Sequence, residues 1–233
     1  MGFLDWWRGR RQARVEPPKP AAPAPAASAA NDAPEPLTDD AIAAALARAA
    51  AEGYRTDDEI VEALTEELVD EYGADADVPA RVQRAAPRVF EARLAEEQAW
   101  PVPTDCDRLD RAFERLEQAG IVARQDFTCC QNCGHAEIGD EIEQARTRGP
   151  VRGYTFFHHQ DTERAAEGGS LYLAYGAVLP KESSEEAWQQ GQLVIAHEVV
   201  AALQAEGLAT SWNGQGNQRI AVGLDWRRRR SRT

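Results

Sequence analysis

Apolar residues recur at helical spacing through the first part of the chain and predict three helices between residues 37 and 100. Thr38 can cap the first helix, and Gly53 can end it. Thr56 and Glu59 have the spacing of a capping box and open the second helix. The apolar residues that share one face within each of these helices are Ile42, Leu46, Ala49, Ile60, Leu64 and Leu68.

The third helix is expected to start near Pro79, because proline suits the first turn of a helix. Pro87 lies inside the same pattern and is expected to kink or interrupt the helix, since it lacks the N–H that an inner turn needs. The candidate core residues of this helix are Val82, Val89, Phe90 and Leu94. Residues 37–100 are therefore predicted to form a small helical subdomain.

The pattern changes after residue 100 to a mixture of helices and strands. Thr104 can cap a helix that Gly120 ends, and a second long helix is expected over residues 185–207. The apolar face of the first of these helices consists of Cys106, Leu109, Phe113 and Leu116. Strands are expected at residues 121–128, 153–160, 171–178, 208–213 and 219–225, and the last two should form a hairpin.

These elements predict an α+β fold. A helical N-terminal subdomain is followed, over residues 101–230, by a mixed, mainly antiparallel sheet of about five strands with helices packed on one face. Along residues 153–160 the alternation directs Phe156 and His158 to one face of the sheet, and Phe157 and His159 to the other.

Two segments precede the predicted helices. Residues 16–36 are rich in proline and alanine and are expected to form a disordered linker. Residues 1–15 form an amphipathic, basic segment in which aromatic side chains adjoin arginines. Through residues 3–11 this segment could make a weak contact with a membrane surface or a partner, or it could be a frayed terminus.

Composition and charge narrow the classes of function. A hydrophobic content of 43% allows a sizeable core, and no apolar run approaches the length of a transmembrane segment. The N-terminus lacks the apolar stretch of a signal peptide, so we expect a cytoplasmic location and cysteines that are reduced or metal-bound. The net charge of −13 disfavours binding of nucleic acid by the acidic body. The arginine-rich C-terminus is expected to be solvated.

Three of the four cysteines lie within residues 126–143, which read DFTCCQNCGHAEIGDEIE. Cys130 and Cys133 form a CxxCG turn, whose two intervening residues let both sulfurs face one point, as in half of a zinc site. The sequence has no second CxxC, so the remaining ligands must come from other residues. The preferred set of zinc ligands is Cys130, Cys133, His158 and one of Cys129 or His135.

Two other interpretations of this turn remain open. Cys130 and Cys133 could form a redox-active pair, but such motifs begin a helix inside a β-α-β unit, and Gly134 argues against a helix through the motif. Alternatively, the thiols could be buried and inert. Cys106, on the apolar face of its helix, is expected to be a core thiol of that kind.

Three separated stretches resemble one known family, in the same order. They are residues 105–138, which include FTCCQNCGHAEI, residues 153–176, which begin GYTFFHHQDT, and residues 219–230, which read RIAVGLDWRRRR. These motifs resemble a bacterial family catalogued as domain of unknown function family 6891. The resemblance covers at least residues 100–230. It implies relatives with the same cysteine turn and the same FFHxQDT strand end, and it implies no activity.

The sequence favours a zinc-stabilised binding or adaptor module for a protein partner, without catalytic activity. On this hypothesis a zinc ion joins strand 121–128 to strand 153–160. The alternative is a thiol- or zinc-dependent enzyme that uses Cys130 and Cys133, with His158 as acid or base.

Overall fold

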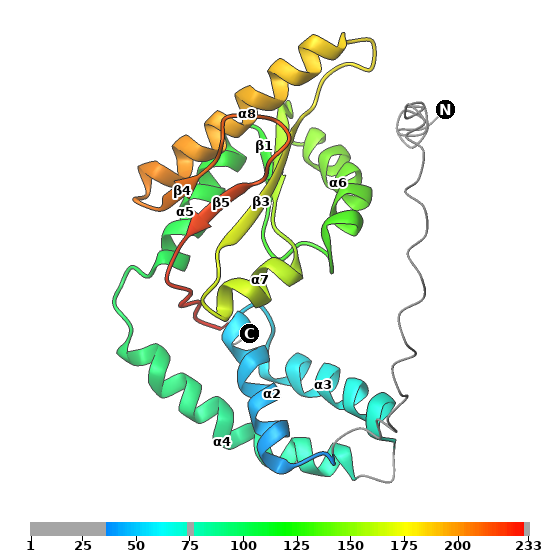
Figure 1. Ribbon diagram of the computed structural model, residues 1–233, viewed down its shortest axis with the longest axis vertical. Coiled ribbons are helices and arrows are strands. Elements are labelled where there is room, and N and C mark those ends of the chain that lie inside the picture. Colours follow the sequence, from blue (N-terminus) through cyan, green and yellow to red (C-terminus); the bar gives the residue numbers. More distant parts are fainter. Residues whose placement is uncertain (1–35, 74–76, 231–233) are drawn as a thin grey trace, which may run out of the picture. The chain divides into compact units, whose positions relative to one another are not determined.

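The computed structural model describes residues 36–73 and 77–230, which belong to one compact unit (Figure 1). The predicted N-terminal segment, residues 1–15, and the predicted linker, residues 16–36, lie outside the described residues except for Pro36. Within the described ranges, no helix is both long and apolar enough to cross a membrane.

Three helices open the described chain, as the apolar spacing predicts. They are α2 at Asp39–Glu52, α3 at Asp57–Tyr72 and α4 at Val78–Ala99. Their apolar faces enclose one hydrophobic cluster, whose most deeply buried members are Ile42, Leu46, Ala50, Ile60, Val78 and Val82.

The ends of the first two helices follow the predicted capping chemistry. The Thr38 side chain accepts a hydrogen bond from the N–H of Ala41, and Thr56 forms a reciprocal capping box with Glu59. Gly53 ends α2 in a left-handed conformation, with φ 84°. Local sequence signals therefore define both helices.

Of the two expected effects of Pro87, a kink or an interruption of the third helix, the interruption is wrong, because α4 continues through Pro87. Proline removes one hydrogen bond from the helix interior. On either side of it, however, Ala86 and Phe90 are buried in the cluster with α2 and α3. Burial of that apolar face outweighs the local preference of one residue.

A mixed sheet forms the second part of the described chain, with its five strands in the order β1-β2-β3-β5-β4. The strands are β1 Ile121–Arg124, β2 Gly153–Phe156, β3 Leu171–Ala177, β4 Ala209–Ser211 and β5 Ile220–Gly223. The helices around them are α5 Asp105–Gln118, α6 Gln131–Arg146, α7 His159–Ala166 and α8 Glu185–Ala205. β1 and β2 are parallel, and the other neighbouring strands are antiparallel. The α+β fold class is thus confirmed, although β2 is shorter than predicted because α7 begins at His159.

The helices cover both faces of the sheet (Figure 1). Ile121 and Phe157 belong to the cluster that α5 and α8 bury, whereas Val122 and Phe156 belong to the cluster that α6 buries. The predicted packing on one face therefore applies to α5 and α8, while α6 covers the opposite face. The sequence predicts a helical or irregular acidic stretch after the cysteine turn, through Gln144, and the structure shows that this stretch is helical, with Ile138 and Ile142 buried one turn apart.

The arginine-rich C-terminus is bound to the fold, which corrects the expectation of a solvated tail. Arg228 donates to Asp110 Oδ1 at 2.7 Å and to Gln125 Oε1 at 2.8 Å. The same guanidinium lies 4.4 Å from the centroid of the Tyr54 ring. A carboxylate, a side-chain amide and an aromatic ring from separate parts of the chain converge here, and the sequence alone does not reveal that convergence.

Arg230 ties the C-terminus to the helical part. Its Nε donates to Glu97 Oε1 at 3.2 Å, and its Nη1 pairs with Asp57. Arg230 is 9% exposed and Glu97 is 4% exposed, so this ion pair lies out of solvent. A buried charge that loses its partner is costly, so the pair makes the helical part and the chain end mutually dependent.

Replacing Arg230 with alanine is expected to lower the free energy of unfolding by about 2 kcal/mol, because the buried Glu97 loses this charged hydrogen bond while Arg93 stays 3.5 Å away. Arg227→Ala is the matched control, since Arg227 pairs with the exposed Asp225 and should cost less than about 0.5 kcal/mol. Urea unfolding followed by circular dichroism measures both variants. Equal effects would contradict the role assigned to Arg230.

Candidate metal and thiol site

The cysteine turn lies at the start of a helix inside a β-α-β unit. β1 leads into a loop of residues 125–130, α6 follows, and β2 returns parallel to β1 (Figure 1). Cys130 is the N-cap of α6, and Cys133 lies in its first turn. The expectation that Gly134 prevents a helix through the motif is therefore wrong. The placement is the one that redox-active CxxC pairs require.

Gly134 serves close packing of the helix rather than a turn. A Cβ at this position would lie 2.4 Å from Cε2 of Phe156, a side chain of β2. The absence of a side chain lets the first turn of α6 approach the sheet closely. Packing against Phe156 thus fixes where the helix, and with it Cys133, stands above the strands.

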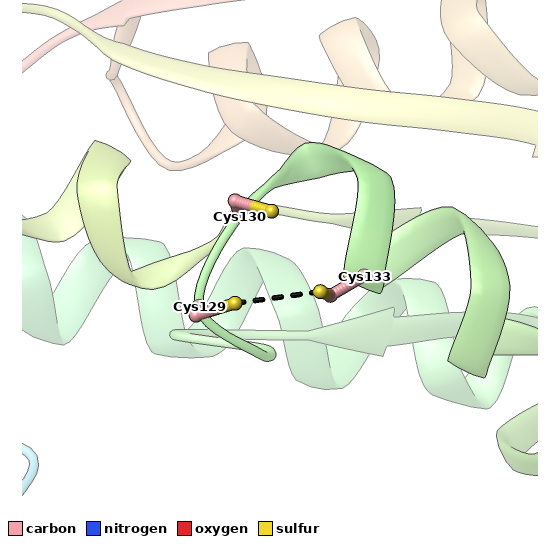
Figure 2. Close-up of side chains that lie close together, drawn as sticks. All are labelled: Cys129, Cys130 and Cys133. Atoms are coloured by element: carbon pink, nitrogen blue, oxygen red, sulfur yellow. Dashed lines mark hydrogen bonds between the residues drawn. The ribbon is translucent and has the colours of Figure 1, made fainter.

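Three thiols converge at this helix start (Figure 2). The Sγ atoms of Cys129, Cys130 and Cys133 all lie within 4.8 Å of one another, and those of Cys129 and Cys133 are 3.4 Å apart. Cys129 is exposed, and the other two are half-buried. The turn brings adjacent Cys129 and Cys130 to one point, although neighbouring side chains diverge in an extended chain.

The loop that carries the cysteines has a constrained backbone. Asp126 and Thr128 have φ values of 49° and 61°, a region that non-glycine residues rarely adopt and that is least favourable for a β-branched threonine. Two hydrogen bonds hold the loop in place. The Phe127 N–H donates to the Phe157 carbonyl at 2.8 Å, and the His159 N–H donates to the Thr128 carbonyl at 3.0 Å. The conformation that gathers the thiols is therefore imposed by the residues after β2.

Cys130 and Cys133 differ in acidity. The backbone N–H of Cys133 and, as a smaller effect, the thiol of Cys133 stabilise the Cys130 thiolate. Both lower the pKa of Cys130. Interactions with Cys129 and Cys130 raise the pKa of Cys133 to about 12. Because interacting thiols lose their protons in steps, the cluster releases the first proton readily and holds another strongly.

His135, a predicted zinc ligand, packs against aromatic rings instead. Its ring centroid is 5.2 Å from that of Phe156 and 6.4 Å from that of Tyr154. Burial lowers the pKa of His135, which favours the neutral imidazole. The structure does not bring His135 into the group of ligand atoms that the three described thiols form.

His158, the other predicted histidine ligand, is buried and paired with a carboxylate. Its Nε2 lies 3.0 Å from Oδ2 of Asp161, and Arg219 also pairs with this carboxylate. Burial lowers the pKa of His158, against the opposing effect of Asp161. Among the described residues that could hold an ion, His158 does not join the thiol group. The sequence offered no signal for Arg219, which stands just before a short strand.

Cys106 lies in the core, as its place on the apolar face of a helix predicts. It is 1% exposed on α5, and burial raises the pKa of its thiol to about 11. It therefore belongs to the packing of the α+β part and not to the thiol cluster.

A comparison with protein families gives one match. The family described as "Domain of unknown function (DUF6891)" matches residues 35–230. The chain belongs to this family. The comparisons with curated proteins and with solved structures find no match. The family resemblance inferred from the cysteine turn and the FFHxQDT strand end is thereby confirmed.

Two glycines of α6 provide a test of the close packing under the cysteines. Gly134→Ala is expected to destabilise the protein by about 1–3 kcal/mol, because the new methyl group would overlap Phe156. Gly139→Ala is the control. A Cβ at Gly139 meets nothing within 4 Å, and alanine in an open helix position should stabilise by up to about 1 kcal/mol. Denaturant unfolding measures both, and stabilisation by both substitutions would show that the first turn of α6 is not pressed against the sheet.

The acidities of the thiols predict an order of alkylation in the metal-free protein. At neutral pH, iodoacetamide should modify Cys130 faster than Cys133, because the lowered pKa gives Cys130 a larger thiolate fraction. Buried Cys106 should react slowest. At higher pH, once Cys130 is fully ionised, the ratio of the Cys130 rate to the Cys133 rate should fall, because only the thiolate fraction of Cys133 still increases. Peptide mass spectrometry of the native protein gives the rates. Faster modification of Cys133 at neutral pH would contradict this assignment.

Proposed function

We propose that the protein is a zinc-binding module in which Cys129, Cys130 and Cys133 hold the ion. The convergence of three sulfur atoms within 4.8 Å of one another carries this proposal. Sulfur ligands around a tetrahedral zinc ion with bonds of 2.3 Å stand about 3.8 Å apart. A spacing that includes 3.4 Å needs only small side-chain shifts to reach that value.

The fourth position of the proposed ion is open to a ligand from outside the cluster. His135 is exposed, its ring contacts those of Tyr154 and Phe156, and it does not lie in the thiol group, while His158 is engaged with Asp161. The exposure of Cys129 supports access from the surface. A water molecule, or a side chain of a partner protein, could complete the tetrahedron. A partner that supplies a ligand would make the module an adaptor whose binding depends on the metal.

A second candidate function is dithiol–disulfide exchange, which the helix start and the lowered pKa of Cys130 favour. In this reaction the Cys130 thiolate attacks a disulfide of a partner and forms a mixed disulfide, which releases the first partner thiolate. The Cys133 thiolate then attacks the Cys130 sulfur of the mixed disulfide and releases the second partner thiolate. Two electrons pass to the partner, its two thiolates take up the protons that the two cysteines lose, and Cys130 and Cys133 end as a disulfide.

Metal content and thiol titration of the full, untagged chain test the zinc proposal. We expect about one zinc ion per chain, as for a single structural site, and loss of that zinc in the Cys130→Ser/Cys133→Ser variant. Chelation should lower the melting temperature of the unsubstituted protein and leave that of the variant unchanged. Cys106→Ala is the control, because it removes a thiol outside the cluster and should retain the metal.

The same measurements separate the two candidate functions. A protein without metal in which Cys129, Cys130 and Cys133 titrate freely would refute the zinc site. If Cys130 and Cys133 then form a disulfide on addition of oxidised glutathione, the exchange reaction is supported. In a cobalt-substituted protein, a change of the visible absorption on addition of a small thiol would support an open fourth position. An unchanged spectrum would indicate a closed site.

A further inference from the structure

A second group of potential metal ligands adjoins loop 125–130 and contains no cysteine. Glu52 is the last residue of α2, and His159 and Glu163 lie one turn apart on α7. Their ligand atoms all lie within 4.8 Å of one another. We propose that these three side chains bind a divalent transition-metal ion, at a site separate from the thiols.

The distances suit an ion better than direct hydrogen bonds. His159 Nε2 is 3.8 Å from Glu52 Oε2 and 3.9 Å from Glu163 Oε1. Both separations exceed the roughly 3.2 Å limit of a good N–H···O hydrogen bond. Nitrogen and oxygen ligands bound at 2.1 Å to a tetrahedral ion stand about 3.4 Å apart. Contraction by a few tenths of an ångström would therefore bring the imidazole to that separation from each carboxylate, and the two carboxylates lie within 4.8 Å of each other.

The imidazole is oriented as a metal ligand through its other nitrogen. Nδ1 of His159 lies 3.1 Å from Oδ1 of Asp126, and the Thr162 hydroxyl donates to the same oxygen at 2.6 Å. A carboxylate oxygen accepts hydrogen bonds, so Oδ1 of Asp126 takes one from the Thr162 hydroxyl and one from the imidazole. Nδ1 therefore carries the proton in the neutral ring, and the lone pair of Nε2 faces Glu52 and Glu163. Histidine ligands of metals have this arrangement, with a carboxylate behind the ring.

The charges around the group favour the binding of a cation. Glu52, Glu163 and Asp126 bring three carboxylates to the group. The guanidinium of Arg55 faces Glu52 and donates a hydrogen bond to its Oε2 at 2.7 Å. Glu52 is 7% exposed, so its charge is buried and is stabilised by a positive partner. Glu163 is exposed, which leaves room for water to complete the coordination of an ion.

The donor atoms indicate the class of metal. One imidazole nitrogen and two carboxylate oxygens favour ions such as Mn²⁺, Fe²⁺ or Zn²⁺, whereas three thiolates favour softer ions. Mn²⁺ is thus a suitable probe, because it distinguishes this group from the cysteine cluster. An ion here would also join α2 to α7, two helices that lie against each other (Figure 1).

Titration of the full chain with Mn²⁺, followed by the electron paramagnetic resonance of the free ion, tests the proposal. We expect one saturable site per chain. Glu163→Gln should weaken binding at least about tenfold, whereas Glu167→Gln, at the C-cap of the same helix, should leave it unchanged. Glu163 is exposed, so the substitution should not impair folding.

A second variant tests the orienting role of Asp126 without disturbing the loop. Asparagine tolerates the left-handed backbone at this position, with φ 49°. Asp126→Asn should therefore preserve the fold and weaken Mn²⁺ binding about 10- to 100-fold. Absence of saturable binding in the unsubstituted protein would overturn the proposal and leave an ion pair between protonated His159 and the carboxylates. Equal binding by the unsubstituted protein and the Glu163→Gln variant would overturn it as well.

Discussion

The parallel pairing of β1 with β2 is the constraint on which the rest of the α+β part depends. The pairing continues past the strands as backbone hydrogen bonds from Phe157 to Arg124, from Phe127 to Phe157 and from His159 to Thr128. This extension holds loop 125–130 against the start of α7 in a backbone conformation that its residues would not adopt alone. The thiols converge, and Asp126 meets His159, because this one segment is fixed.

The distribution of charge follows from the same packing. An acidic chain must place its carboxylates without excessive repulsion, and here Asp57, Asp110 and Glu97 each pair with a C-terminal arginine. Arg228 reaches both the helical part, through Tyr54, and the first residue of the cysteine loop, Gln125. The last residues of the described chain therefore contribute to the position of the loop that carries the candidate sites. The arginine run has a structural role where the sequence suggested a free tail.

Much of the fold was predictable because its signals are local. Thr38, Thr56 and Thr104 cap the helices as expected. The alternation predicted along residues 153–160 assigns Phe156 and Phe157 to the correct faces of the sheet, but it does not apply to His158 and His159, because β2 ends at Phe156 and α7 begins. The errors concern residues whose partners are distant in sequence. Gly134 resembles a helix breaker until Phe156 is placed beneath it, and Pro87 resembles a helix end until the burial of its neighbours is known. The cysteine cluster was recognisable from spacing, but His158 could not be separated from it, because its pairing with Asp161 and Arg219 requires three elements to meet.

Loop 125–130 links the two candidate sites physically. Asp126 faces His159 at one end of the loop, and Cys129 and Cys130 stand at the other, three and four residues later. The intervening Thr128 accepts a hydrogen bond from the backbone N–H of His159, so the peptide that precedes the cysteines is held to the first residue of α7. An ion at the carboxylate–histidine group would hold the His159 imidazole in place, and an ion or disulfide at the thiols would hold the other end. Binding at either site would restrict the motion of loop 125–130, so less conformational freedom would remain to be lost on binding at the other site. Occupancy of one site should therefore favour occupancy of the other, by the reciprocity that any coupling between binding sites must obey.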